Sequence, residues 1–186
     1  MIHLLVTAHI GGDLAYLPSL FAVLAQSRRS LNTRPFLIDT GLAWSAESWV
    51  CAATGNRAPY IVLDAMAYHV AFADGLDAPK RDALQMQMMT RLVIEQAQIT
   101  ENEQVLKLKR DASLPTPVFQ DQVLILNLPP KGIIQHLIVS LEAHQIVHNY
   151  SIEVPSNTLP DPTIAATVEF VVREARYYIK KQEERG

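Results

Sequence analysis

The first half of the chain alternates between short apolar runs and stripes of apolar residues at helical spacing. Residues 2–7, 36–39 and 69–72 are continuous apolar runs that are typical of buried strands. Between them, residues 17–24 and 60–66 repeat apolar side chains every three or four positions, which predicts helices, and a further mixed helix is expected at 44–53. A β-α-β-α-β order predicts parallel strands that lie side by side with helices packed on them.

The second half is dominated by patterns that predict strands. Residues 80–97 carry apolar side chains on one face and are expected to form a helix. The runs that follow are strand-like and are separated by prolines or polar breaks: 105–108, 123–126, 133–141 and 146–154. No helix-length segment separates these runs, so we expect mostly antiparallel pairing, in an extension of the first sheet or in a second sheet.

The end of the chain carries a helix start signal. Asp161 is expected to cap a helix that has Pro162 at its first position. Ile164, Val168 and Val171 then begin an apolar stripe, so this final helix should pack on the body of the protein. The fold class expected from the whole pattern is α/β, as a single domain over residues 1–186.

Composition narrows the classes of partner. The 186 residues are 49% hydrophobic with a formal net charge of −3, so no basic field would attract nucleic acid or an anionic membrane. The single cysteine, Cys51, cannot form an intramolecular disulfide, and a thiolate zinc site is not expected. Met1 leads directly into the first apolar run without a basic segment, and no run is long enough to cross a bilayer. These features predict a cytoplasmic protein.

Four segments of the first half follow the order and spacing of a known set of motifs. They are residues 7–12 (TAHIGG), 14–20 (LAYLPSL), 37–42 (LIDTGL) and 55–68 (GNRAPYIVLDAMAY). With these segments the chain resembles the calcineurin-like metallophosphoesterases, above all their 5′-nucleotidase branch. The resemblance implies a layered β-sheet core flanked by helices, in which the family uses two metal ions to clamp the attacking and leaving oxygens of a phosphate ester.

The resemblance also implies that most of the metal ligands have been replaced. The family's opening Asp-x-His corresponds to His9 and Gly11, and its bridging Asp corresponds to Leu42. Its Gly-Asn-His-Glu segment falls at about residues 74–77 (DGLD), and only Asp39 keeps the family's residue. Two dications at close distance repel strongly without a bridging carboxylate. We therefore expect no binuclear metal site and no metal cofactor.

A remnant of the ancestral site is expected at His9, Asp13, Asp39 and Trp44, as a ligand-binding site without catalytic residues. The alternative is a divalent Mn, Zn or Fe ion held by His9, Asp39 and Asp74. Each residue also has a structural interpretation. Asp39 would cap the turn that follows it, Asp13 would cap a helix, and Trp44 would pack in the core or an interface.

Two further features bear on ligands. Gly11 and Gly12 precede a helix and could hold a small anionic ligand with backbone N–H groups, although such a diglycine more often forms just a tight turn. His144 and His148 are four residues apart, a spacing that suits a metal only on a helix, whereas the sequence around them predicts a strand.

The function that the sequence favours is a degenerate metallophosphoesterase-like protein with a binding or assembly role. One alternative is an active, nucleotidase-like phosphohydrolase built from His9, Asp13, Asp39 and Asp74. Another is the structural subunit of a homo-oligomer, because the apolar second half would leave strand edges that have to be covered.

Overall fold

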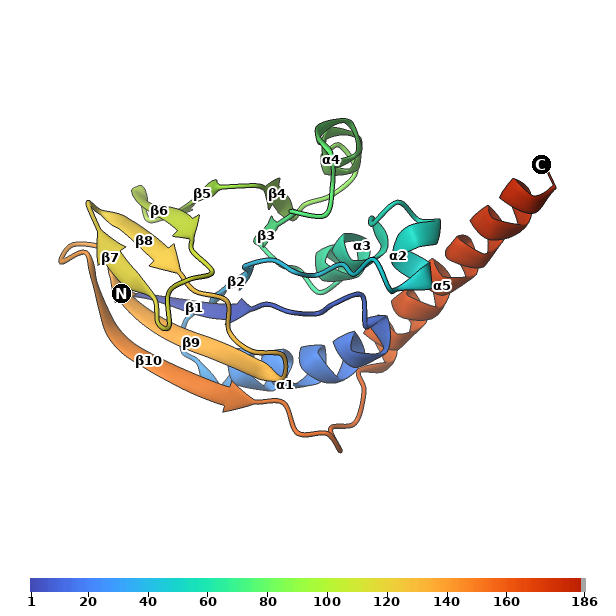
Figure 1. Ribbon diagram of the computed structural model, residues 1–186. Helices are drawn as coiled ribbons and strands as arrows, with labels where there is room; N and C mark the ends of the chain where they lie inside the picture. The colour runs from blue at the N-terminus through green and yellow to red at the C-terminus, as the bar shows by residue number, and fades with distance from the viewer. Residues whose placement is uncertain (185–186) are drawn as a thin grey trace.

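The computed structural model describes residues 1–184 and arranges them in three layers (Figure 1). A six-stranded sheet lies in the middle, helices pack on one of its faces, and a four-stranded sheet packs on the other. This mixed α/β architecture confirms the fold class that the sequence predicts.

The central sheet combines parallel and antiparallel strands in the order β10-β9-β1-β2-β3-β4. Its strands are β1 (Ile2–Thr7), β2 (Phe36–Asp39), β3 (Val70–Phe72), β4 (Arg91–Val93), β9 (Ile133–Ser140) and β10 (Gln145–Glu153). Strands β1 to β4 are parallel, with Thr7 opposite Asp39 and Asp39 opposite Ala71. Strand β9 pairs antiparallel with β1, and β10 with β9. The predicted side-by-side arrangement of the first three strands is confirmed.

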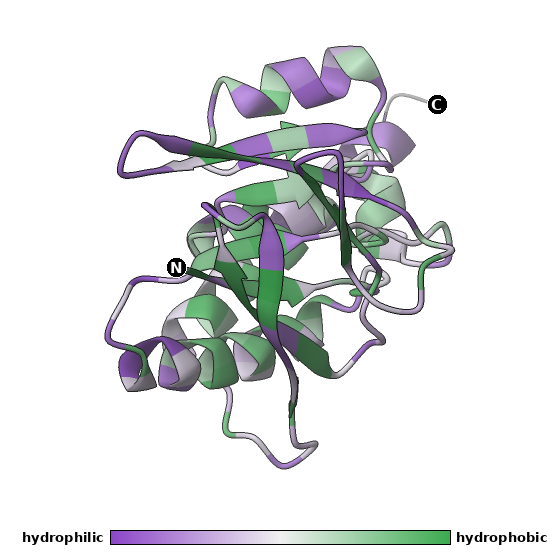
Figure 2. Ribbon diagram, turned by 90° about the vertical axis from the view of Figure 1, so that its left-hand side faces the viewer, coloured by the Kyte–Doolittle hydropathy of each residue, from purple (hydrophilic) through white to green (hydrophobic). Residues whose placement is uncertain are grey.

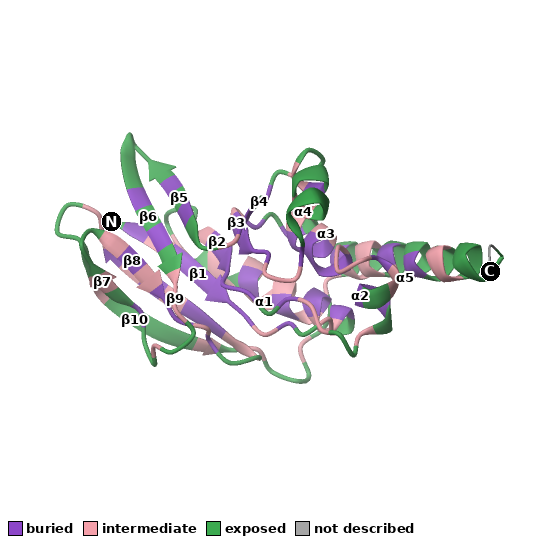
Figure 3. Cartoon of the chain, turned by 45° about the horizontal axis from the view of Figure 1, so that its top comes forward, coloured by how far each residue is buried: buried purple, intermediate pink, exposed green. Residues whose placement is uncertain are grey.

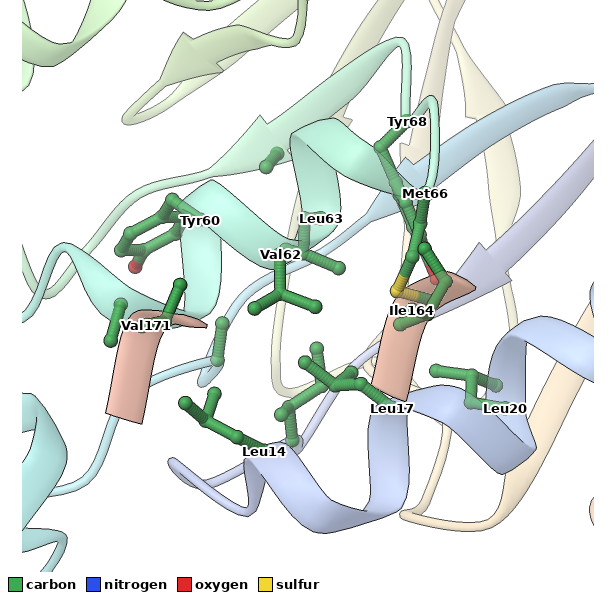
Figure 4. Close-up of a cluster of buried hydrophobic side chains, with 14 of the residues drawn as sticks. Leu14, Leu17, Leu20, Tyr60, Val62, Leu63, Met66, Tyr68, Ile164 and Val171 are labelled. Carbon is green, nitrogen blue, oxygen red and sulfur yellow. The ribbon is translucent and has the colours of Figure 1, made fainter. Parts of the chain in front are cut away.

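The helices bury one face of this sheet. They are η1 (Leu14–Tyr16), α1 (Leu17–Ser30), α2 (Trp49–Ala53), α3 (Ala58–Ala65), α4 (Ala78–Gln85) and α5 (Pro162–Glu183). Leu17 and Leu20 of α1, Leu63 of α3 and Ile164 of α5 meet in one buried cluster (Figure 4). Helix α5 begins as the sequence predicts, because the Asp161 carboxylate accepts N–H groups at the helix start.

The second sheet packs against the opposite face, in the order β5-β6-β8-β7. Its strands are β5 (Gln96–Glu101), β6 (Gln104–Arg110), β7 (Val118–Gln120) and β8 (Val123–Leu126). Strands β5 and β6 alternate between buried and exposed residues (Figure 3). The buried side chains, which include Leu106 and Leu108, meet Leu4 and Val6 of β1. Figure 2 shows many hydrophobic residues along the strands of the two sheets.

The prediction of one helix over residues 80–97 is wrong. Helix α4 ends at Gln85, and the chain then enters β4 and β5. The Asp64 carboxylate accepts the N–H groups of Met89 and Thr90, which diverts these groups from helical bonding. The Gln85 side chain holds the same turn by accepting the N–H of Leu92 and donating to the carbonyl of Thr90. Four side-chain hydrogen bonds, two from Asp64 and two from Gln85, thus outweigh the helical spacing.

Two smaller expectations also need correction. The helix expected over 44–53 begins only at Trp49, where the Ser48 side chain accepts the N–H of Cys51 as a cap. Strands β6 and β8 pair in parallel, because the short strand β7 lies between them in sequence and forms a hairpin with β8. The other pairs within the second sheet are antiparallel, as expected.

None of the helices within residues 1–184 is both long enough and apolar enough to cross a bilayer.

Because the two sheets share a buried interface, they are expected to unfold together. Leu108→Ala removes a fully buried side chain from the second sheet and should lower the free energy of unfolding by about 2–5 kcal/mol. Both tryptophans, Trp44 and Trp49, lie outside this sheet, so their fluorescence in urea reports on the other half. The fluorescence transition should shift to lower urea.

Val105→Ala, at a residue 52% exposed on the same strand, is the matched control and should change little. An unshifted fluorescence transition in Leu108→Ala would show that the two halves unfold separately.

Candidate functional site

The carboxyl ends of β1 and β2 lead into two loops that run together. Gly11 and Gly12 donate their N–H groups to the carbonyls of Leu42 and Ala43, over 2.9 and 2.8 Å. His9 and Leu42 both adopt left-handed backbone conformations with φ of 57°, which costs a non-glycine residue roughly 1–2 kcal/mol. The paired backbone holds them there. Since the two glycine N–H groups already bind carbonyls, they are not available to an anion in this conformation.

Asp39 is completely buried at the end of β2. Its Oδ1 accepts the N–H of Gly41 over 3.0 Å, and its Oδ2 accepts the hydroxyl of Thr7 over 3.1 Å. The Thr7 hydroxyl also bonds the hydroxyl of Tyr68, 2.9 Å away. The predicted role of Asp39 as a turn cap is confirmed. Burial raises the pKa of Asp39 to about 8, so the carboxyl group is largely protonated at neutral pH.

A cation from the second sheet enters this site. Arg110, at the end of β6, donates from Nη1 to Asp74 Oδ2 over 2.8 Å and to the carbonyl of Thr40 over 3.2 Å. Its guanidinium carbon also lies 5.5 Å from the centroid of the Phe72 ring. A Cβ atom at Gly41 would overlap Nη1, so the close approach of the guanidinium requires glycine there. Arg110 and Asp74 form a partly buried ion pair, with side chains 22% and 19% exposed.

Trp44 covers the backbone next to this ion pair. A Cβ atom at Gly75 would overlap the indole ring, so the ring lies directly on the Gly75 backbone. The carbonyl of Gly75 accepts the Asn56 side-chain amide over 2.9 Å. Behind it, two buried atoms have no hydrogen-bond partner among the described residues: Asp74 Oδ1 and the Tyr60 hydroxyl. Burial raises the pKa of Tyr60, and the nearby Asp74 and Asp39 carboxyl groups raise it further.

The other two predicted site residues point to a different segment. His9 Nδ1 lies 3.0 Å from the carbonyl oxygen of Pro129, which requires that Nδ1 carries the proton. Asp13 forms an ion pair with Lys131 at 2.8 Å, and it gives no side-chain cap to the helical turn that follows. The expectation that Asp13 caps a helix is therefore wrong, because Lys131 binds its carboxylate. Asp39, Asp74 and Trp44 lie around Arg110 and Gly41, whereas His9 and Asp13 face the loop between β8 and β9.

These residues do not fit a two-metal centre. In the alternative ligand set, His9 binds Pro129, Asp39 binds Thr7 and Gly41, and Asp74 binds Arg110. Within the part of the chain that the structure describes, no three His, Cys, Asp or Glu side chains are grouped so that they could hold a metal ion.

The second histidine pair is likewise dispersed. His144 meets the edge of the Phe119 ring, and His148 stacks on Tyr150.

Arg110 is the site residue that the sequence interpretation missed. Along β6, Leu106 and Leu108 are buried while Lys107 and Lys109 are exposed. Arg110 therefore falls on the inward phase of the strand. The sequence feature that could have identified Arg110 is a charged residue at an inward-facing position of a strand. Such a group needs a partner inside the protein.

Comparison with solved structures finds a likeness to Yfce, a phosphoesterase from E. coli. The TM-score is 0.44 with 12% sequence identity, and the match covers 83% of this chain and 100% of that chain. The sequence matches no family model and no curated protein.

The buried carboxyl group of Asp39 should make stability depend on pH. Folding raises the pKa of Asp39 from 3.8 to about 8, so between these values the folded protein holds a proton that the unfolded chain has released. This stabilising contribution is complete below about pH 4 and is lost as the pH rises through about 8. Asp39→Asn keeps the shape and cannot titrate, so it should gain stability relative to the wild type as the pH rises.

Urea unfolding of both proteins at about pH 5 and about pH 9 measures this change. The expected relative gain is a few kcal/mol, since one pKa unit corresponds to about 1.4 kcal/mol. Asp13→Asn, at a half-exposed carboxylate, is the control and should follow the wild-type profile closely. Parallel pH profiles for the wild type and Asp39→Asn would show that Asp39 does not change its protonation on folding in this range.

Proposed function

We propose that this chain is a metallophosphoesterase-like protein of the 5′-nucleotidase type that has lost its binuclear metal site. Its role is binding or assembly rather than hydrolysis, and it needs no metal cofactor. The observation that carries the proposal is the placement of Arg110 at the carboxyl ends of the parallel strands, where it binds Asp74 and the Thr40 carbonyl.

A guanidinium at this place opposes a metal ion for an electrostatic reason. At an effective dielectric constant of about 20, a dication about 4 Å from the guanidinium would be repelled by roughly 8 kcal/mol. The same guanidinium already neutralises Asp74, the carboxylate that a metal would need. Arg110 therefore supplies the positive charge that a metal ion would otherwise supply at this site.

Two neighbouring residues support the same interpretation. Leu42, which corresponds to the bridging aspartate in the resemblance, offers no ligand atom, and its side chain is 39% exposed. Asp39 is buried and is expected to be largely protonated at neutral pH, which makes it a poor ligand for a divalent ion. No contact among the described residues favours the altered-site phosphohydrolase, which remains as an outcome of the tests below.

Protein purified without chelator should contain no stoichiometric pair of transition metals and should not cleave nitrophenyl phosphate mono- or diesters. The reason is that the matching positions supply too few imidazole and carboxylate ligands for two ions. Elemental analysis and a manganese-supplemented assay measure both. Two metal ions per chain, or manganese-dependent cleavage that disappears in Asp39→Ala, would favour the phosphohydrolase.

Removal of the Arg110 guanidinium should make the stability of the protein depend on manganese. Arg110→Met keeps the side-chain stem but leaves Asp74 unpaired, so the free energy of unfolding should fall by roughly 2–4 kcal/mol. Manganese at about millimolar concentration should then raise the melting temperature of this variant and leave that of the wild type unchanged, since carboxylate and carbonyl oxygens suit this ion.

The matched control is Lys131→Met, which breaks the half-exposed ion pair with Asp13. It should cost less than about 1 kcal/mol and should gain no manganese response. If manganese stabilises the wild type as much as Arg110→Met, Arg110 does not take the place of a metal ion.

A further inference from the structure

Only part of helix α5 packs on the rest of the protein. Its fully buried residues are Ile164, Val171 and Ala175, which pack among α1, α2 and α3. No residue after Ala175 in the described part of the helix is buried, and this end projects from the body (Figures 1 and 3). An isolated helical end is only marginally stable in water, so a projecting end of this length gains from a packing partner.

One face of α5 carries exposed residues in a continuous line. Six exposed residues recur at spacings of three and four and form what we name the α5 stripe: Ala166, Phe170, Arg173, Glu174, Tyr177 and Lys181. The stripe is about 22 Å long at 1.5 Å per residue. Phe170 and Tyr177 are 61% and 59% exposed, although both rings are large and apolar. Among residues 1–184, the one ion pair of Arg173 is an exposed contact with Glu169 at 3.9 Å.

Two copies of the α5 stripe are complementary to each other when their helices run antiparallel. If two α5 helices lie antiparallel with their midpoint between residues 173 and 174, Phe170 of one faces Tyr177 of the other. Arg173 then faces Glu174, and Ala166 faces the aliphatic stem of Lys181. Each pairing occurs twice, as a two-fold symmetric interface requires. The register therefore joins aromatic to aromatic and positive to negative, with a small residue opposite a long side chain.

We infer that two copies of this chain associate through antiparallel pairing of the α5 stripe. This inference names the partner for the assembly role proposed above and rests on that role. A two-fold axis passes between Arg173 and Glu174, and the two ion pairs around it set the register. The two aromatic pairs, one on each side of the axis, supply most of the apolar contact.

A cleft beside the stripe extends the contact surface. It has a volume of about 310 Å³, lies between α3, α4 and α5, and includes Phe170 and Met88 in its wall. Met86 and Met89, which flank the lining residues Gln87 and Met88 in the sequence, are 84% and 94% exposed. A specific interface buries roughly 1,200–2,000 Å² in total, more than one pair of helices supplies alone. In the dimer, Tyr177 of the second copy packs on Phe170 at this cleft, and the flexible methionines adapt to it.

Charge reversal tests both the surface and the register. The wild type should have twice the mass of one chain by light scattering during gel filtration at about 10–50 µM, a range in which micromolar dimers are populated. Arg173→Glu places two Glu–Glu contacts across the axis, and Glu174→Arg places two Arg–Arg contacts. Each single variant should weaken dimerisation at least tenfold and shift the measured mass toward that of one chain. The double variant Arg173→Glu/Glu174→Arg restores opposite charges in exchanged positions and should be a dimer again.

Arg176→Glu is the matched control, since it reverses an exposed charge on α5 outside the stripe and should leave the mass unchanged. Circular dichroism should show the same helix content in all variants, because every altered side chain is exposed. A monomeric wild type, dimers that persist in the single variants, or a double variant that stays monomeric would each overturn the inference. Metal content is independent of these masses. A dimer with two bound metal ions would contradict only the proposed function, and a metal-free monomer only the dimer.

Discussion

The ion pair between Arg110 and Asp74 is the interaction on which the rest of the site depends. It joins the end of β6 in the second sheet to the segment after β3 in the first, and the same guanidinium binds the Thr40 carbonyl after β2. Three chain segments that are 36 and 70 residues apart in sequence are thereby held at one place. Breaking such a pair by removing one partner leaves an uncompensated charge in a partly buried position, which is more costly than losing an exposed ion pair.

The polar cluster of Arg110, Asp74 and Asp39 contains no uncompensated buried charge. Asp74 is balanced by Arg110, and Asp39 avoids the cost of a buried charge through a raised pKa and bonds to Thr7 and Gly41. The loops around them are held together by backbone hydrogen bonds. The Asp74 carboxylate thus stabilises the contact between the two sheets, whereas Asp39 stabilises the turn after β2 within the first sheet. The surface available for recognition lies elsewhere, and we place it on the exposed side of α5.

Much of the architecture could be predicted from local sequence. Strands β1, β2 and β3 are continuous apolar runs because both of their faces are covered, one by helices and one by the second sheet. Helix α5 was recognisable from Asp161 and Pro162, since an N-cap and its first turn involve only neighbouring residues. The turn cap of Asp39 was predictable for the same reason, because its partner Gly41 is two residues away. The sequence by itself therefore determined the elements whose stabilising contacts are local, together with their order.

Tertiary contacts decided the rest. The helical spacing over residues 80–97 was overruled by Asp64, whose carboxylate binds N–H groups 25 and 26 residues further along the chain. The predicted cluster of His9, Asp13, Asp39 and Trp44 was divided, because His9 and Asp13 meet a loop more than 110 residues away. Arg110 entered the site from a strand that no motif connects with it. Spacing along a chain specifies which side chains share a face, but which charges meet depends on how distant elements pack, and only the folded structure contains that information.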